Sequence, residues 1–232
     1  MKTILSLSAL LITLTLTAQT NPATWYLNDT SGNGIQSPFG NTASGGFSTS
    51  LGQNTTASGE GSTAMGENTT ASDYGSTAMG GETTASGVLS TAMGASTTAS
   101  GGASTAMGEN TTASGVLSTA MGLSTIASDT SSLVIGEYNL LGSIVTNSAT
   151  EFSADNTAFV IGNGIDADNR SDALTVLFDG TTTIAGDFNI NSDKKVFFGN
   201  QSFIEGATEG TVLILNANNN ILFRPGGTTT VN

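Results

Sequence analysis

Single hydrophobic residues recur every fourteen positions through the middle of the chain, and each is followed directly by a glycine. Five successive units carry methionine at this position, while Leu51 precedes them and Ile135 follows them in the same register. The five residues are Met65, Met79, Met93, Met107 and Met121. A fixed period of this length predicts a stack of repeated units with atypical units at its ends. The predicted array covers residues 41–136.

Each unit contains two Thr- and Ala-containing segments half a period apart, separated by turn residues; residues 63–66 read Thr-Ala-Met-Gly and residues 70–72 read Thr-Ala-Ser. A seven-residue spacing also occurs in coiled coils, but a glycine or turn residue in nearly every heptad costs a helix about 1 kcal/mol relative to alanine. Short Thr-rich segments between turn residues are typical of strands. We therefore predict an all-β fold, a parallel β-roll or solenoid with two strands and two tight turns per coil and with coils about 4.8 Å apart.

Side chains alternate between the two faces of a strand, so Thr63 and Met65 share one face and Ala64 takes the other. If alanine points inward, a row of methionines lies on the outside of the roll and predicts association through this exposed apolar stripe. The opposite register, with Thr and Met inside and Ala outside, stays open and would remove that stripe.

The chain begins with an expected export signal. Lys2 is followed by an apolar stretch over residues 4–16 and by small residues that suit cleavage after Ala18. We assign residues 1–18 to a signal peptide and residues 19–40 to an N-terminal cap of the roll. No later segment is long and apolar enough to predict a membrane span after signal cleavage.

The strict period ends at Gly136, and the remaining sequence predicts an irregular β-rich region over residues 137–232. Short β-branched or aromatic segments alternate there with turn dipeptides. The expected strands are residues 173–178, 181–184, 195–198, 211–215 and 221–223.

Composition and charge exclude several classes of function. The formal net charge is −13, which opposes binding to nucleic acids and to anionic membrane surfaces. The chain has no cysteine and no histidine, and so lacks disulfides, thiolate metal sites and the commonest general base. No nucleophile is combined with a base, so we expect no enzyme activity and no cofactor.

The units with Ser-Thr-Ala-Met-Gly at residues 62–66 and Thr-Ala-Ser at residues 70–72 resemble the head repeats of trimeric autotransporter adhesins, the YadA-like left-handed parallel β-roll. The resemblance covers about residues 41–136 and recurs weakly at residues 158–162. It implies a homotrimer on the bacterial cell surface, or secreted, that adheres to host, matrix or other cells through an unknown protein or glycan ligand.

The C-terminal sequence departs from that family, because residues 226–232 follow neither coiled-coil heptads nor an alternating aromatic anchor strand. We therefore do not expect this chain to anchor itself in an outer membrane. Its C-terminal part is loosely similar to the β-rich shaft segments of trimeric phage tail fibres. A tail-fibre component is accordingly one alternative function.

Three carboxylates, Asp166, Asp168 and Asp172, alternate like part of a calcium loop. The glycine and distal glutamate of such a loop are missing, and Arg170 adds a positive charge. A solvated loop is the expected interpretation, and a cation site is the alternative.

Threonine and serine residues form two further periodic series along the second strand of each coil. On a rigid roll they would make parallel files of hydroxyls, as an ice-binding plane requires, although threonine is also simply a good strand former. These candidate surface-binding residues are Thr56, Ser58, Thr70, Ser72, Thr84, Ser86, Thr98, Ser100, Thr112 and Ser114. The main hypothesis is thus a non-catalytic adhesion module, and an ice-binding solenoid is the other alternative.

Overall fold

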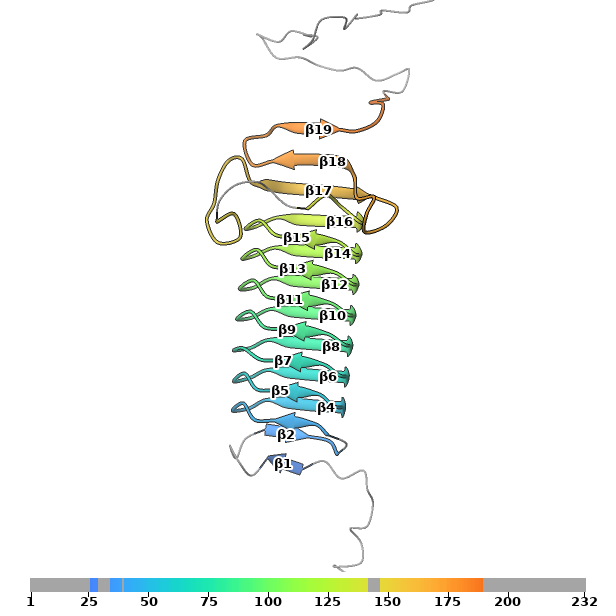
Figure 1. The fold of residues 1–232 in the computed structure, drawn as a ribbon. Helices are drawn as coiled ribbons and strands as arrows, with labels where there is room; N and C mark the ends of the chain where they lie inside the picture. Colours follow the sequence, from blue (N-terminus) through green and yellow to red (C-terminus); the bar gives the residue numbers. More distant parts are fainter. Residues whose placement is uncertain (1–25, 29–33, 39, 142–146, 190–232) are drawn as a thin grey trace, which may run out of the picture. The chain divides into compact units, whose positions relative to one another are not determined.

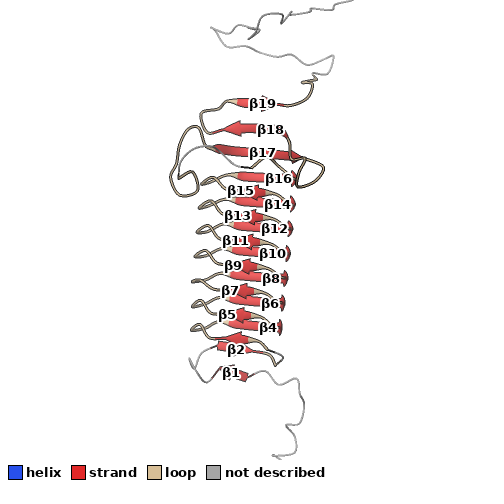
Figure 2. Cartoon of the chain, in the orientation of Figure 1, coloured by secondary structure: helices blue, strands red, loops and turns tan. Residues whose placement is uncertain are grey.

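The structure is a computed structural model that describes residues 26–28, 34–38, 40–141 and 147–189. Contacts divide the chain into two units, Met1–Asp187 and Phe188–Asn232, and the following concerns the first unit. Its described residues form strands and turns and no helix, which confirms the predicted all-β class (Figure 2).

Each coil of the roll consists of one five-residue strand and one two-residue strand joined by tight turns. The long strands are β4 (Thr49–Gln53), β6 (Thr63–Glu67), β8 (Thr77–Gly81), β10 (Thr91–Ala95), β12 (Thr105–Glu109), β14 (Thr119–Leu123) and β16 (Leu133–Glu137). The short strands are β3 (Thr42–Ala43), β5 (Thr56–Ala57), β7 (Thr70–Ala71), β9 (Thr84–Ala85), β11 (Thr98–Ala99), β13 (Thr112–Ala113) and β15 (Ile126–Ala127).

Successive coils stack in parallel and in register, so that each residue pairs with the residue one repeat later (Figure 1). Thr63 pairs with Thr77, and Met65 pairs with Met79. Backbone hydrogen bonds connect the coils, as where the Thr56 N–H donates to the Thr69 carbonyl at 2.8 Å. The predicted parallel β-roll with a fourteen-residue coil is confirmed.

The long strands belong to a twelve-stranded sheet, called here the long-strand sheet, and the short strands form a seven-stranded sheet, the short-strand sheet, within the described residues. The long-strand sheet begins with β1 (Tyr26–Asn28) and β2 (Gly34–Gln36). It ends with β17 (Thr157–Asn163), β18 (Asp172–Leu177) and β19 (Thr182–Ile184).

The interior of the roll is filled by alanine. Ala64 of the long strand and Ala71 of the short strand have no exposed surface, as do the equivalent alanines of the other repeats from Ala57 to Ala127. Met65 is half-buried on the outer face. The register with Ala inside is therefore the one adopted, and the alternative with Thr and Met inside is not.

Two columns of small hydroxyl residues complete this interior, and the sequence analysis missed both. They precede each strand and are represented by Ser62 and Thr69, whose side chains are fully buried. The hydroxyl of Thr69, like those of Thr83 and Thr97, has no hydrogen-bond partner among the described residues. Extending the alternation of faces one residue before each strand would have placed both columns inside.

A column of glycines lets the coils approach one another closely at the end of each long strand. Gly94 has φ +123°, and a Cβ atom there would lie 2.0 Å from the carbonyl oxygen of Gly108 in the next coil. L-residues rarely adopt this conformation, and no atom fits at that distance. The glycine after each methionine is therefore a steric requirement of the stack.

Asparagines end the buried threonine column in both directions. At the start, the Asn41 side chain accepts a hydrogen bond from the Thr55 N–H at 2.9 Å. At the other end, Asn139 accepts from the Ile126 N–H at 2.7 Å and donates to the Ile126 carbonyl at 3.0 Å. These amides satisfy backbone groups that the last short strands would otherwise leave unpaired.

Beyond β16 the long-strand sheet continues while the short-strand sheet stops. β17 still pairs in parallel, with Gly162 opposite Gly136, whereas β18 and β19 are antiparallel. Arg170, from the loop between β17 and β18, donates to the carbonyls of Ser124 and Asn139 at 3.0 and 3.1 Å. Its guanidinium also lies 5.8 Å from the ring centre of Tyr138.

Two of the strands expected in the C-terminal region are present, as β18 and β19. The expected strands at residues 195–198, 211–215 and 221–223 lie outside the described residues, as does the predicted signal peptide.

Replacing Gly94 by alanine tests the glycine column. We expect Gly94→Ala to lower the free energy of unfolding by about 1–3 kcal/mol, because the new methyl group meets the backbone of the next coil. Gly81→Ala is the matched control, since a Cβ atom there meets nothing within 4 Å. It should change stability by less than about 0.5 kcal/mol. Denaturant unfolding measures both, and equal effects would contradict the steric explanation.

Candidate binding surfaces of the roll

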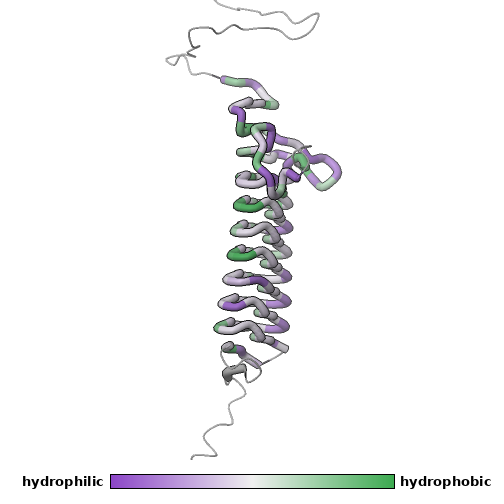
Figure 3. The backbone as a smooth tube through the Cα atoms, turned by 90° about the vertical axis from the view of Figure 1, so that its left-hand side faces the viewer, coloured by the Kyte–Doolittle hydropathy of each residue, from purple (hydrophilic) through white to green (hydrophobic). Residues whose placement is uncertain are grey.

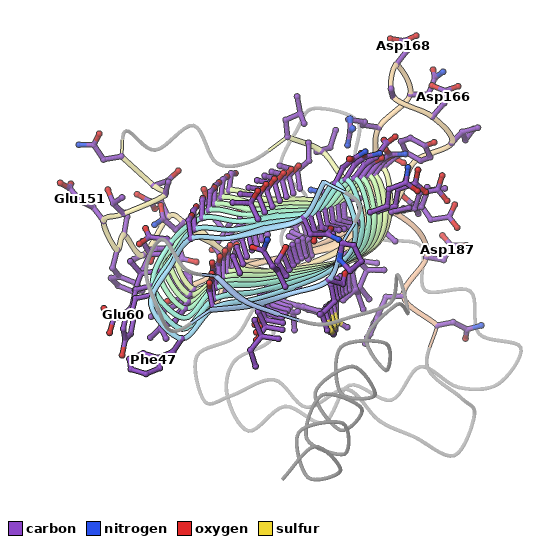
Figure 4. The ribbon with its side chains drawn as sticks, turned by 90° about the horizontal axis from the view of Figure 1, so that it is seen from below. Phe47, Glu60, Glu151, Asp166, Asp168 and Asp187 are labelled. Atoms are coloured by element: carbon purple, nitrogen blue, oxygen red, sulfur yellow. The ribbon has the colours of Figure 1, made fainter. Side chains whose placement is uncertain are left out.

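The outer face of the long-strand sheet consists of one threonine column and one methionine column. The five methionines pair with one another in register and are half-buried, and their sulfur atoms lie in a single row on the outside of the roll (Figure 4). Leu51 continues this methionine column at one end, and Ile135 and Ile161 continue it at the other. Neither column contains an ionisable group from β4 to β16, so the face suits contact with another apolar surface.

The outer face of the short-strand sheet carries the predicted hydroxyl files. Thr56, Thr70 and Thr84 pair directly across neighbouring strands and are half-buried. The serines two residues later, such as Ser72 and Ser86, are exposed. The structure thus places the ten candidate residues in two parallel files on one side of the roll.

A third surface, which the sequence analysis missed, is an edge of the roll formed by the turns that precede the long strands. Large apolar side chains are exposed there, among them Phe47, Tyr74, Leu89 and Leu117. Figure 3 shows hydrophobic turns along one edge of the stack, and Figure 4 shows Phe47 and Glu60 projecting from it. We call Phe47, Tyr74, Val88, Leu89 and Leu117 the apolar edge.

Three members of the apolar edge adopt an unfavourable backbone conformation. Phe47, Leu89 and Leu117 have φ of 58°, 56° and 59°, where the equivalent turns of other coils contain Gly61, Gly75, Ala103 and Ser131. A bulky residue in the left-handed region costs about 1–2 kcal/mol relative to the usual conformation. A large apolar residue at a turn position that other coils fill with glycine, alanine or serine is the sequence signal that would have identified this edge.

The candidate cation residues are not gathered into one site. Asp166 accepts hydrogen bonds from the backbone N–H groups of Asp168 and Asn169 at 3.0 and 2.8 Å. The Asn169 side chain also donates to Asp166, and it is the main reason that the pKa of this exposed carboxyl lies below its ordinary value. Asp166 and Asp168 project away from the roll (Figure 4).

Asp172 has a structural role at the end of the roll instead. Its carboxylate accepts from the Leu140 N–H at 2.8 Å and from the Thr175 hydroxyl at 3.2 Å, and burial raises its pKa. Among the described residues no group of three or more acidic side chains is arranged to hold a metal ion.

A cavity of about 580 Å³ lies where the short-strand sheet stops. Its lining includes the apolar side chains of Val134, Val160 and Leu177 and the carboxylate of Asp129. One Asp129 oxygen accepts from the Thr157 N–H at 2.8 Å, and the other is buried and has no hydrogen-bond partner in the described part of the chain. The cavity forms because the short-strand sheet ends here while the long-strand sheet continues. None of its lining residues belongs to the methionine column, the hydroxyl files or the apolar edge.

Comparison with known protein families identifies the repeats. The sequence model described as "YadA head domain repeat (2 copies)" matches residues 43–66, 57–83, 85–111 and 113–137. No curated protein matches the chain. Within the described residues, no helix is both long and apolar enough to span a membrane.

Substitutions of Leu89 test whether the fold requires the apolar edge. Asparagine tolerates the left-handed conformation better than leucine, so Leu89→Asn should leave the free energy of unfolding unchanged or raise it by up to about 1 kcal/mol. Leu89→Ile keeps the apolar surface but places a β-branched residue at φ 56° and should destabilise the chain by about 1–2 kcal/mol. Chemical denaturation compares the two, and a marked loss of stability in Leu89→Asn would show that the leucine is part of the core.

Proposed function

From the premise that the repeats between residues 43 and 137 form a YadA-type adhesin head, we propose that the chain is an exported, non-catalytic bacterial surface protein that adheres as a homotrimer. The observation that carries the proposal is the agreement between the matched repeats and the fourteen-residue coils of the roll.

The five methionines of the outer column, called here the methionine file, support the assembly. Alanine, serine and threonine fill the interior of the coils that carry methionine, and the larger Met side chains lie outside and are half-buried. Burying an apolar side chain of this size fully contributes about 1.5–3 kcal/mol. Identical copies share one coil spacing, so their methionine files stay in register along the whole stack when they meet.

This assembly leaves other surfaces for a ligand. The hydroxyl files lie on the opposite side of the roll from the methionines, and the apolar edge lies between the two faces. Exposed hydroxyls and isolated apolar side chains fit a protein or glycan surface that offers both hydrogen bonds and apolar contacts. Host tissue, extracellular matrix and other cells are the proposed targets.

Residues outside the roll complete the proposal. A signal peptide at residues 1–18 directs export, residues 19–40 cap the first coil, and residues 137–232 are a β-rich, shaft-like region. The acidic composition keeps the exported chain away from nucleic acids and anionic lipid surfaces.

A double substitution in the methionine file tests the assembly. We expect the exported chain to have three times the mass of one chain in solution, as measured by light scattering during size-exclusion chromatography. Met93→Asp with Met107→Asp should yield monomers, because paired carboxylates cannot be buried in an apolar contact. The control pair, Ser86→Asp with Ser100→Asp, lies on the opposite face and should remain trimeric. A monomeric parent chain, or a trimeric Met93→Asp, Met107→Asp variant, would refute the proposed interface.

Ice binding is a second candidate function, favoured by the geometry of the short-strand sheet. Its two hydroxyl files repeat at the coil spacing of about 4.8 Å in one direction and at about 6.6 Å along the strand. The files contain no ionisable group from β5 to β13. A rigid and regular array of hydroxyl and methyl groups is what a crystalline ice plane requires.

Thermal hysteresis and ice-crystal shaping measure this second function. If the hydroxyl files bind ice, Thr84→Tyr and Thr98→Tyr should each abolish most of the hysteresis, because a ring protrudes from the otherwise flat face. Glu109→Tyr, at an exposed position outside the hydroxyl files, should retain it. Ordinary, unshaped ice crystals in the presence of the parent chain would eliminate ice binding.

A further inference from the structure

The sulfur of this chain is concentrated in one place. The sequence has six methionines and no cysteine, and apart from Met1 every sulfur atom belongs to the methionine file. A reagent that attacks sulfur therefore meets one face of the roll after removal of the predicted signal peptide.

The fold does not require methionine at these positions. The same column contains Leu51, Ile135 and Ile161 in neighbouring layers, which pair in register with Met65, Met121 and Ile135. β-Branched and aromatic residues are more favourable in strands than unbranched ones. Five successive methionines in a column that accepts leucine and isoleucine therefore require an explanation other than strand formation.

The thioether differs from these aliphatic side chains in its reaction with oxidants. Peroxide transfers one oxygen atom to the sulfur, the O–O bond breaks, and water leaves. The sulfur is thereby oxidised by two electrons and the peroxide is reduced by two. The product, methionine sulfoxide, is polar and accepts hydrogen bonds, whereas the thioether is apolar.

We propose that the methionine file is an oxidation-sensitive switch, in which sulfoxide formation by peroxide prevents the rolls from associating. This inference rests on the proposed assembly through that file. The five side chains are stacked in adjacent layers and half-exposed in the single chain, so oxidation converts a continuous apolar stripe into a continuous polar one. Burying such a row against identical rows is unfavourable, because each sulfoxide oxygen loses its hydration and this face supplies as donors one threonine hydroxyl per methionine layer.

Because the units repeat, dissociation of the assembly depends steeply on the number of methionines that are oxidised. One sulfoxide alters a single layer and leaves the other contacts intact, whereas oxidation along the file changes every layer between β6 and β14. Enzymatic reduction of the sulfoxides by a dithiol reductant restores the apolar stripe.

The experiment compares the parent chain with a variant in which all five residues of the file are changed to leucine. Both are incubated with hydrogen peroxide in the folded state, and intact mass spectrometry counts the oxygen atoms, each adding about 16 Da. Light scattering follows the mass in solution at the same times. We expect the parent chain to gain up to five oxygens and to fall from trimer to monomer, while the leucine variant stays trimeric.

Each contrary result has a separate meaning. If the parent chain stays trimeric with five sulfoxides, the switch is wrong but the proposed assembly is not. The same holds if peroxide, at concentrations that oxidise free methionine, fails to oxidise the parent trimer. Dissociation of the leucine variant in peroxide also overturns it, because the loss then does not depend on sulfur. A parent chain that is monomeric before peroxide is added refutes the proposed assembly itself.

Discussion

The in-register hydrogen bonding between coils is the constraint on which the rest of this structure depends. Stacking identical coils at the spacing of a β-ladder brings each residue onto its own equivalent in the next layer. At the glycine column this spacing leaves 2.0 Å between a hypothetical Cβ and the next carbonyl oxygen, which excludes any side chain. In the interior it selects alanine, which is fully buried in both strands of the five repeats that carry methionine. The small-residue composition follows from the geometry of the ladder.

A thin interior in turn determines the outer surface. Because the space between the two sheets is filled mainly by alanine, serine and threonine, the larger apolar residues of the repeats lie on a face or an edge, apart from the buried Val134 of the last coil. The methionine file and the apolar edge are both consequences of this arrangement, but they differ in backbone conformation. Met93 lies in a regular strand, whereas Leu89 adopts φ 56° in a turn. The strand accepts methionine without strain, while the turn retains leucine against its conformational preference.

The fourteen-residue coil could be predicted from the sequence, because Met-Gly and Thr-Ala-Ser recur along the chain at a fixed spacing. Alternation alone did not predict which face of each strand points inward, because it is compatible with either face. The side-chain volume that fits inside the assembled coil decides between them. The end of the roll was harder still. Asn139 replaces a strand partner for Ile126, and Arg170 reaches the carbonyl of Ser124 from a distant loop. Asn139 keeps the register of the buried threonine column, fourteen residues after Thr125. The contact of Arg170 with Ser124 joins residues with no repeat relation, so no pattern in the sequence indicates it.

Repetition also gives the proposed adhesion a way to act through extended faces of the roll. Each of the five coils that carry methionine offers the same few groups, a Met and a Thr on one face and a Thr and a Ser on the other, and each group contributes little alone. Because the coils are held rigidly at one spacing, a ligand that meets one layer is positioned to meet the next, and the contacts combine as in multivalent binding. A single substitution on a face then removes one layer of several, whereas a chemical change common to all layers removes the whole surface. The methionine file is the one surface of the described roll on which a single reagent makes that common change.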